Sequence, residues 1–412
     1  VATKQRLWDK YRWTNVSDRV TEVWPFDAYF CASIGHVCDV YHTFDGVTNT
    51  DQSAQVILVP KDSRGPRLIS AEPVEFQWIQ QGLREAIYRL VESHKLTEHN
   101  VFFTDQGPNQ RGALLGSSTN RYATLDLKEA SDRVSLDLVR LLFPSHVTDV
   151  LEASRSTSTV LPSGEVLKLQ KFAPMGSALC FPILALTIWS LLTARAPDED
   201  TKEGILVYGD DVIVPTAYAE DAMAILEEFG LMINRSKSCI QGSFRESCGV
   251  DAFLGTNVTP VRFRTVWKSS RRPDVYESWI AYANQLFDKQ YFTTHSVISE
   301  SLHREYGAIP DWGLHLAAPS LKGNEYQGSA GRFKSRINQN LQKRQLKVRV
   351  VKSPTVTREM DGWSMLLRWF TEARKADDPF SFENREAYPV VEPDIAFSVR
   401  QYTRRHSSIL VR

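Results

Sequence analysis

The sequence has no excess charge of either sign and no apolar run long enough to cross a membrane. Lysine plus arginine and aspartate plus glutamate number 49 each among 412 residues. The bulk composition therefore gives no indication of a nucleic-acid partner, and only a local arrangement of charge could. The long apolar run at 178–192 has 15 residues and contains Pro182, whereas a spanning helix needs about 20 residues. We expect a buried helix there and no association with a membrane.

Paired cysteines are also lacking. The five cysteines are odd in number and include no C-x-x-C pair, which argues against a disulfide framework and favours reduced thiols in a cytosolic compartment. Hydrophobic residues make up 42% and aromatic residues 11% of the chain, so we expect an ordinary globular protein of two or three domains. The chain starts at Val1 rather than at a methionine, and we expect a further N-terminal segment to precede it.

The most informative stretch is ILVYGDDVIVP at 205–215, where Asp210 and Asp211 stand between two runs of strand-forming residues. Gly-Asp-Asp favours a turn, since Gly209 tolerates a positive φ, and the pattern predicts a β-hairpin. A GDD tripeptide arises by chance in roughly one chain of this length in ten, so two interpretations stay open. The carboxylates are either simple turn residues or oxygen ligands for Mg²⁺, a cation that prefers oxygen.

Predicted strands and helices alternate around this hairpin, which indicates an α+β fold. Residues 122–127 are typical of a strand that ends near Asp126, and a helix with an apolar side over 134–142 follows. A strand at 55–60 leads into a basic loop, KDSRGPR at 61–67. The remaining predicted elements are a helix at 73–94, a hairpin around 162–164, helices at 178–192 and 219–233, short strands within 247–264, and a mixed, largely helical pattern after 265.

Carboxylates on separate elements are what a two-metal phosphoryl-transfer site needs, because two Mg²⁺ ions about 3.5 to 4 Å apart must share them. Asp126 with Asp210 and Asp211 could supply these ligands. Cations suited to a triphosphate lie in the basic loop and after the hairpin, namely Lys61, Arg64, Arg67 and Lys237. Each basic residue taken singly is more simply interpreted as solvated surface. Their joint order along the chain favours the functional interpretation.

That order resembles a known family. A basic loop, D-x5-D, MGS before an apolar helix, a YGDD hairpin and a following lysine are similar to motifs F, A, B, C and D of viral RNA-directed RNA polymerases. The stretches DLKEASDRVS, MGSALCF, YGDDVIVP and GSFRESCG narrow the resemblance to the replicase beta subunits of the leviviral, single-stranded RNA bacteriophages, or to a close narna-like relative. The resemblance is specific over 59–260, about half the chain, and AIPDWG at 308–313 adds a fainter match.

The resemblance implies a right-handed polymerase with fingers, an RRM-like palm made of an antiparallel sheet flanked by helices, and a thumb. On this basis we predict fingers at 1–120, with their N-terminal part truncated. A palm with inserted fingers segments is predicted at 121–264, and a thumb with the C-terminal region at 265–412. The implied activity is RNA-directed RNA polymerisation, a nucleotidyl transfer that replicates a viral RNA genome.

The matched motifs also imply residue roles. Asp126 and Asp210 correspond to metal ligands, and Asp211 to a weaker or outer ligand beside them. Asp132 corresponds to the residue that helps recognise the ribose 2′-hydroxyl. Gly176 and Ser177 correspond to the loop that moves around nucleotide and template, although many phage replicases carry Asn where this chain has Ser177.

The basic residues match further parts of the family pattern. Lys61, Arg64 and Arg67 correspond to the cations over the incoming triphosphate, and Lys237 to the proposed proton donor for the leaving pyrophosphate. The segment FRESCG at 244–249 leads toward a primer-grip hairpin in the family, with plain structural packing as the alternative interpretation. The expected cofactor is a pair of Mg²⁺ ions, for which Mn²⁺ can substitute.

The resemblance implies partners as well. These are an RNA template and product strand, ribonucleoside triphosphates and host translation elongation factors as subunits, in the cytoplasm of an infected bacterial host. The basic segment at 332–352 carries eight basic residues and no acidic one. Charge alone does not decide between RNA-phosphate contact and a solvated helix face or strand edge there.

Two alternatives to an RNA polymerase remain open. A reverse transcriptase shares the palm and a YxDD turn, but Gly209 is typical of RNA-synthesising members, and Asp132 stands where a bulky aromatic residue would exclude the ribose 2′-hydroxyl. A non-catalytic RNA-binding protein on a decayed polymerase fold is the other, and decay should have removed some of these charged residues. Incorporation of ribo- against deoxyribonucleotides, and RNA binding without metal-dependent turnover, would distinguish the three.

Overall fold

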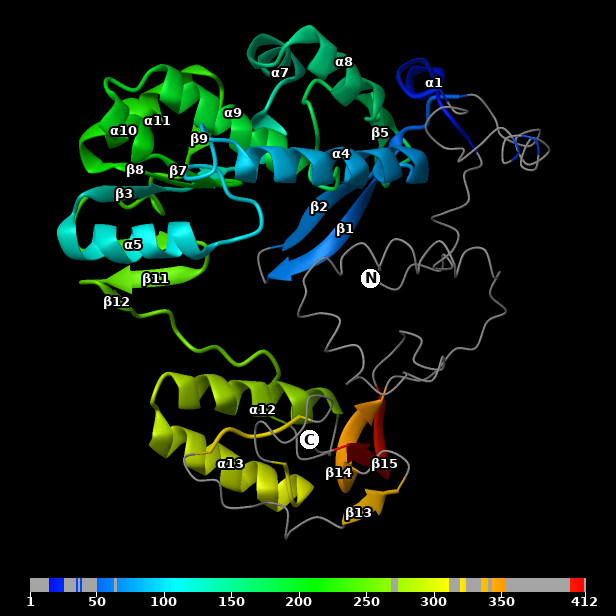
Figure 1. The fold of residues 1–412 in the computed structure, drawn as a ribbon, viewed down its shortest axis with the longest axis vertical. Coiled ribbons are helices and arrows are strands. Elements are labelled where there is room, and N and C mark those ends of the chain that lie inside the picture. The colour runs from blue at the N-terminus through cyan, green and yellow to red at the C-terminus, as the bar shows by residue number, and fades with distance from the viewer. Residues whose placement is uncertain are drawn as a thin grey trace. The chain divides into compact units, whose positions relative to one another are not determined.

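The computed structural model describes residues 15–25, 35, 38, 50–62, 65–267, 273–310, 319–323, 335–339, 343–352 and 401–410. The chain divides into two compact units, Thr3–Thr259 and Pro260–Arg412, and the first contains the acidic hairpin. The predicted α+β class agrees with the mixture of helices and sheets in the first unit (Figure 1). The division into fingers, palm and thumb stays a prediction.

A three-stranded antiparallel sheet in the order β3-β8-β7 carries the acidic hairpin. Its strands are β3 (Tyr122–Leu125), β7 (Leu206–Tyr208) and β8 (Asp211–Pro215). Val212, Ile213 and Val214 are all buried, so β8 is covered on both faces. A continuous apolar run is typical of such a strand, in contrast to the alternation of a half-exposed one.

Helices cover this sheet on both sides (Figure 1). One face packs against α9 (Cys180–Ala194) and α11 (Ala219–Glu228). The predicted apolar helix at 178–192 is thereby confirmed as a buried helix, and Pro182 is tolerated because it lies in the first turn of α9. Within the described part of the chain, no helix combines the length and the apolar character needed to cross a membrane.

The opposite face of the sheet packs against α5 (Gly107–Thr119), which lies between the β3-β8-β7 sheet and a second sheet, β10-β11-β12 (Figure 1). Polar side chains of α5 bond to both sheets. Asn109 Nδ2 donates to the backbone oxygen of Asp211 at 3.0 Å, and Gln110 Nε2 donates to that of Cys248 at 3.1 Å. The second sheet consists of β10 (Phe244–Ser247), β11 (Val250–Phe253) and β12 (Thr256–Asn257). It confirms the short strands predicted in this region.

A four-stranded sheet in the order β2-β1-β5-β6 contains the predicted basic loop. Its strands are β1 (Ala54–Asp62), β2 (Gly65–Ala71), β5 (Ser158–Val160) and β6 (Val166–Lys168). The loop prediction at 61–67 was therefore too long. Antiparallel pairing continues to Asp62 and Gly65, because ladder hydrogen bonds outweigh the weak strand propensity of these residues.

The long helix α4 (Val74–Ser93) follows this sheet and confirms the helix predicted at 73–94, with Pro73 at its N-cap. The helix predicted after Asp126 is instead two helices, α6 (Ala130–Arg133) and α7 (Leu136–Leu142). Ser135 separates them, because its side-chain oxygen accepts from Leu138 N and caps α7. The other elements that are described in this unit are α1 (Asp18–Val23), β4 (Leu127–Lys128), α8 (Ser145–Ala153), α10 (Glu199–Glu203), the short 3₁₀ helix η2 (Thr216–Tyr218) and β9 (Met232–Ile233).

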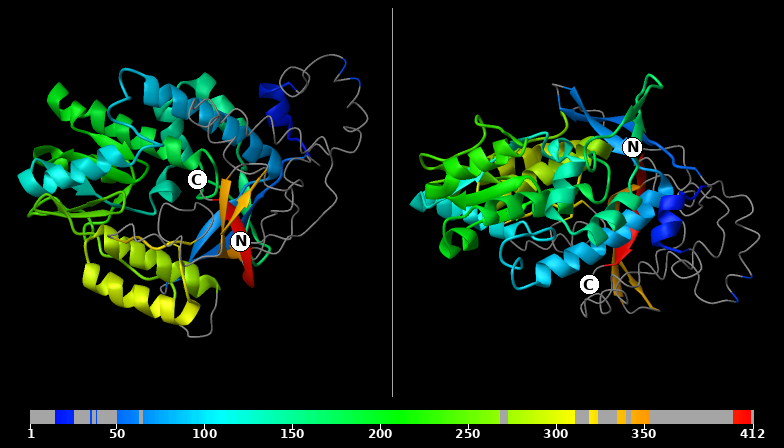
Figure 2. Two further views of the ribbon diagram at one scale, coloured as in Figure 1. Left: turned by 60° about the horizontal axis from the view of Figure 1, so that its bottom comes forward. Right: turned by 90° about the horizontal axis from the view of Figure 1, so that it is seen from above.

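In the described part of the second unit, α12 (Pro273–Asp288) and α13 (Phe292–Tyr306) lie side by side (Figure 2). Its antiparallel sheet consists of β13 (Ser335–Asn338), β14 (Lys343–Lys352) and β15 (Gln401–Leu410). The expectation of a largely helical C-terminal region was thus incomplete. The basic segment at 332–352 contributes β13 and β14, and its contact with RNA stays a prediction.

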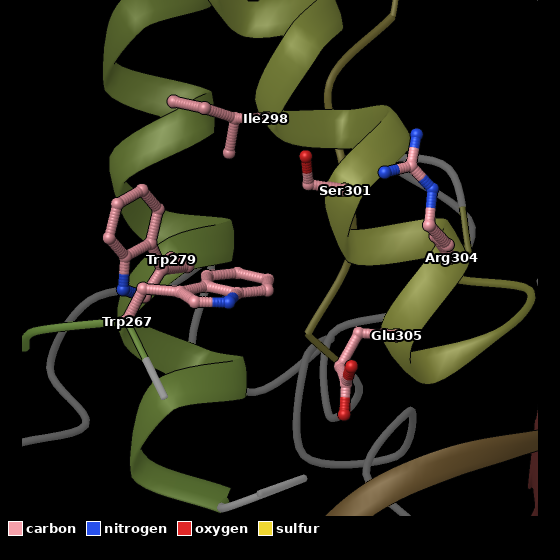
Figure 3. Close-up of a pocket in the computed structure, with 6 residues that line it drawn as sticks. All are labelled: Trp267, Trp279, Ile298, Ser301, Arg304 and Glu305. Atoms are coloured by element: carbon pink, nitrogen blue, oxygen red, sulfur yellow. The ribbon is translucent and has the colours of Figure 1, made fainter. Parts of the chain in front are cut away.

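A cavity of about 370 Å³ lies beside α12 and α13 (Figure 3). Trp267 and Trp279 meet edge to face there, with ring centroids 5.2 Å apart. The other lining residues are Ile298, Ser301, Arg304 and Glu305. None of the residues predicted to act in catalysis lines it.

Arg245 ties the second sheet to the first. Its side chain is fully buried, and Nε donates to the backbone oxygen of Tyr122 at 2.6 Å. Nη1 donates to the oxygen of Gly242 at 2.8 Å, and Nη2 donates to Asn120 Oδ1 at 2.6 Å. Burial lowers the pKa of Arg245, and these acceptors compensate the buried charge.

Replacing Arg245 by methionine should destabilise the first unit by about 3 kcal/mol, because the buried acceptors would lose their donors. Arg235→Met is the matched control, since Arg235 pairs with Glu227 at the surface and should cost no more than about 1 kcal/mol. Urea unfolding of the two variants measures both values. Equal stability losses would show that the buried guanidinium is not an anchor.

Candidate active site

The acidic hairpin has the geometry that its glycine predicts. β7 and β8 pair from Tyr208 to Asp211, so Gly209 and Asp210 form a two-residue turn. The φ of Gly209 is +63°, and Asp210 is not among the described residues with a positive φ, which is the pattern of a type II′ turn. A Cβ on Gly209 would lie 2.2 Å from Cε2 of Phe181. Glycine is therefore required for both backbone conformation and space.

Strand pairing places Asp126 beside this turn. β3 pairs antiparallel with β8, with Leu125 opposite Val212, and the same register continued by one residue sets Asp126 opposite Asp211. The backbone oxygen of Asp126 accepts from Asn234 N at 2.8 Å, and its amide donates to Ser238 Oγ at 3.1 Å. Asn234 Nδ2 also donates to Asp126 Oδ2 at 2.5 Å. Both backbone and carboxylate of Asp126 are held in place.

The three carboxylates interact electrostatically. Partial removal from water raises the pKa of Asp210, and the negative charge of Asp126 raises it further. Desolvation likewise raises the pKa of Asp211, with Asp210 and Asp126 adding to the effect. The side chain of Asp210 keeps contact with solvent, so protein surrounds this carboxylate without enclosing it. The repulsion favours a cation at this point.

Asp211 is turned toward the β10–β11 turn. The backbone amide of Cys248 donates to Asp211 Oδ1 at 3.2 Å, and Ser247 Oγ donates to the same oxygen at 3.4 Å. The Cys248 thiol lies 3.7 Å from Oδ2. Burial raises the pKa of Cys248 to about 12, so the thiol is neutral and can donate. The segment at 244–249 thus has a packing role, and its place in a primer grip stays a prediction.

These hydrogen bonds bear on the fit of a metal. Oxygen donors of carboxylates suit Mg²⁺, and the neighbouring negative charges that contribute to the raised pKa values of Asp210 and Asp211 would be offset by a cation. Among the residues that the structure describes, however, no group of three His, Cys, Asp or Glu side chains is arranged around one ion position. The donor chemistry fits, while Asp211 and Asp126 are engaged with Cys248 and Asn234.

Two predicted cations lie near the acidic turn. Arg67 in β2 and Lys237 after β9 are both exposed, and their charges act to lower the pKa of Asp210 against the larger effect of desolvation. Lys61 belongs to β1, but its side chain is outside the described residues, as is all of Arg64. The structure therefore brings Arg67 and Lys237 to the site and leaves the other two untested.

Asp132 is also in this neighbourhood. It lies in α6 and forms an ion pair with Lys171, with Nζ and Oδ1 2.6 Å apart. Burial raises the pKa of Cys180 to about 11, and the charges of Asp132 and Asp210 contribute in the same direction. Both aspartates thus lie within electrostatic range of one thiol. No sequence signal indicated Lys171, which is 39 positions from Asp132.

The loop at 174–178 supplies the last two predicted residues. Gly176 has a φ of +123°, and a Cβ there would lie 2.2 Å from the backbone oxygen of Ser70. Ser177 is buried, and its Oγ donates to Oε1 of Gln80 at 3.0 Å. The hydroxyl of Ser177 therefore points into the protein. Sequence reasoning missed Gln80, because it lies inside a helix whose pattern predicts only an amphipathic face.

Comparison with known proteins identifies relatives. The family described as RNA replicase, beta-chain, matches residues 28–272. The chain is 37% identical over 225 residues to the RNA-directed RNA polymerase subunit beta of Enterobacteria phage SP, covering 53% of this chain and 37% of that protein. It is 34% identical over 226 residues to the same subunit of Qbeta virus (strain MX1), with the same coverage. The chain spans 35 to 37% of the length of the curated relatives it matches.

Solved structures of telomerases and of RNA-dependent RNA polymerases resemble the chain with TM-scores of 0.36 to 0.40. One is a loop-deletion mutant of the RNA-dependent RNA polymerase of a human picorbirnavirus. It is 11% identical, covers 61% of this chain and 57% of that one, and has a TM-score of 0.38. Structural similarity at these identities and TM-scores does not identify a family, so the family assignment depends on the sequence match.

Replacing Gly209 by alanine should destabilise the protein by about 2 to 4 kcal/mol, because the new Cβ meets both a positive φ and the Phe181 ring. Gly82→Ala is the control, since Gly82 lies in α4 and a Cβ added there would meet no other atom within 4 Å. This control should gain about 0.5 to 1 kcal/mol. Thermal unfolding followed by circular dichroism measures both. A Gly209→Ala protein as stable as the parent would contradict the described turn.

Proposed function

Because this chain belongs to the RNA replicase beta-chain family, we propose that it is the catalytic part of an RNA-directed RNA polymerase that replicates a phage RNA genome. The observation that carries the proposal is the clustering of Asp126, Asp210 and Asp211 at adjoining strand ends, with Arg67 and Lys237 in electrostatic range. Carboxylates and cations in this combination suit transfer of a nucleotide from a triphosphate.

We also propose which parts of the fold correspond to the fingers, palm and thumb of a polymerase. In a right-handed polymerase the β3-β8-β7 sheet with α9 and α11 would be the core of an RRM-like palm. The palm would extend over 121–264, with inserted fingers segments. Residues 1–120 would belong to the fingers and 265–412 to the thumb and C-terminal region. The covered sheet supports this assignment, because it provides a rigid base for the acidic turn.

Asp126, Asp210 and Asp211 would hold two Mg²⁺ ions. Bound there, Mg²⁺ or Mn²⁺ would supply Lewis-acid activation of the 3′-hydroxyl and stabilisation of the leaving pyrophosphate. Binding would require Asp126 or Asp211 to exchange a contact, with Asn234 or with Cys248. Oδ2 of Asp211 is the oxygen most easily freed, because its contact with the Cys248 thiol is 3.7 Å long, whereas Oδ1 accepts from the Cys248 amide.

The remaining residues would bind the substrate. Arg67, with Lys61 and Arg64 from the same hairpin, would bind the triphosphate, and Lys237 would donate a proton to pyrophosphate as the bond to the α-phosphorus breaks. Asp132, oriented by Lys171, would recognise the ribose 2′-hydroxyl. The loop with Gly176 and Ser177 would lie beside the nucleotide and template. Host elongation factors as subunits and the cytoplasm of an infected bacterium complete the proposal.

RNA-templated incorporation of labelled ribonucleotides with Mg²⁺ tests the activity. We expect Asp210→Asn to lose at least about 100-fold in rate, because one of the carboxylates proposed to hold Mg²⁺ would be gone. Asp149→Asn, at an exposed position of α8, is the control and should keep parental activity. Each protein is assayed with and without bacterial extract, which shows whether host subunits are required.

Three outcomes would contradict the proposal. Preference for deoxyribonucleotides would indicate a reverse transcriptase. Full activity of Asp210→Asn would remove the acidic turn from catalysis. RNA binding without incorporation, in buffer and in extract, would favour a non-catalytic RNA-binding protein.

Millimolar Mg²⁺ should raise the melting temperature of the parent by several degrees, because a bound cation would stabilise the ionised forms of Asp210 and Asp211, which desolvation and, to a smaller extent, neighbouring negative charge disfavour. At 10 to 100 times the dissociation constant, ligand linkage contributes about 1.4 to 2.7 kcal/mol. Asp210→Asn should show a smaller shift, and Asp149→Asn the parental one. Equal shifts in all three proteins would place the bound cation elsewhere.

A further inference from the structure

Gln80 joins three segments that are distant in sequence. It lies in α4, is fully buried, and its Oε1 accepts from both Ser177 Oγ and Ala178 N at 3.0 Å each. Its Nε2 donates to the backbone oxygen of Ser154 at 2.7 Å. The amide of one side chain thereby connects α4 to the loop before α9 and to the end of α8.

The orientation of this amide is determined by its neighbours. The backbone amide of Ala178 can only donate and the backbone oxygen of Ser154 can only accept. A flipped amide would therefore set a donor against a donor and an acceptor against an acceptor. Both ends of Gln80 are satisfied in one orientation, which makes the contact specific.

The loop is held from its other side by β2. The amide of Ser70 donates to the backbone oxygen of Met175 at 2.8 Å, and Gly176 approaches the oxygen of Ser70 too closely for any side chain. The backbone of the loop at 174–178 is therefore hydrogen-bonded on one side to the Ser70 amide and on the other side to the Gln80 side chain. Its shape depends on these two supports together with Gly176, whose positive φ and close approach to Ser70 admit no side chain.

The Ser177 hydroxyl is already hydrogen-bonded to other groups of the protein. It donates to Gln80 and also accepts from the amide of Leu179 at 3.2 Å, and the residue is 8% exposed. A hydroxyl with one proton already donated to a buried acceptor has no second proton for a ligand. Its oxygen keeps one further acceptor lone pair, but the residue is nearly buried, so we expect Ser177 to influence a nucleotide mainly through the conformation of the loop.

We propose that Gln80 is a positioning residue for nucleotide binding, which acts with Ser177 as one unit to fix the loop at 174–178. This inference rests on the proposed function, in which that loop lies beside the incoming nucleotide. Gln80 itself touches no substrate. Its loss changes nucleotide affinity because the loop then samples conformations that do not bind.

The test uses two substitutions of Gln80 and one control. Gln80→Met keeps the length of the side chain and removes both polar ends. Gln80→Glu keeps the acceptor and one donor, because a buried carboxyl beside Glu72, which is hydrogen-bonded to Gln80, is favoured in its neutral form, whose C=O accepts and whose single O–H donates. Thr187→Val is the control, since Thr187 is a fully buried residue of α9 whose hydroxyl has no partner among the described residues.

We expect Gln80→Met to raise the KM for ribonucleoside triphosphates about tenfold, the loss of one to two net hydrogen bonds, with kcat within about threefold of the parent. Gln80→Glu should restore most of the affinity, and Thr187→Val should match the parent. Ser177→Ala combined with Gln80→Met should be no worse than Gln80→Met alone, because the two residues act through the same contact. A fall in kcat at constant KM, or additive losses, would reduce Gln80 to a structural residue.

Hydrogen exchange of the 176–179 amides, followed by mass spectrometry, provides a readout that needs no activity. Gln80→Met should accelerate exchange of the Ala178 amide at least about tenfold, while Gln80→Glu and Thr187→Val leave it near the parental rate. Unchanged protection in Gln80→Met would overturn the inference even in an active polymerase. If the parent incorporates no nucleotide but Gln80→Met still deprotects the loop, the proposed function fails and the control of the loop by Gln80 stands.

Discussion

The antiparallel pairing of β3 with β8 is the constraint from which the rest of the site follows. The two strands are far apart in the sequence, yet their register, with Leu125 opposite Val212, brings the strand end that leads to Asp126 beside the acidic turn. A shift of one residue would turn every side chain of β8 to the other face. Val212, Ile213 and Val214 are all buried between helices, and a slip would exchange side chains of different volume in a closely packed core and displace Asp211 from the strand end.

The acidic carboxylates at the hairpin reduce the stability of the folded state. The pKa values of Asp210 and Asp211 are raised by desolvation and by neighbouring negative charge, so the ionised forms destabilise the folded state. The sign follows from linkage: with pKa values above those of the unfolded chain, these groups reduce stability as pH rises through their folded pKa values. Buried apolar strands and the Arg245 anchor provide the compensating stability.

The sequence was informative where function depends on local pattern. The turn at Gly209, the strand end at Asp126 and the buried helix at 178–192 each have a signal within a short window, and the structure contains all three. Motif order was sufficient to indicate the replicase family, which the match over 28–272 confirms.

Contacts between segments could not be predicted from such short patterns. Gln80 and Ser177 are 97 positions apart, and such pairs depend on how elements pack. The extended β1–β2 hairpin and the strands β13 to β15 were missed for a related reason, since cross-strand pairing overrides weak local propensity.

The Arg245 anchor has a consequence for synthesis on the ribosome. Tyr122 is translated 123 positions before the guanidinium that its carbonyl oxygen accepts from, which at elongation rates of about 5 to 20 residues per second is an interval of roughly ten seconds. During that interval the first sheet can form, but the β10–β11 turn that holds Asp211 does not yet exist outside the ribosome. The nascent chain therefore completes its acidic site late, after nearly all of the first unit has emerged.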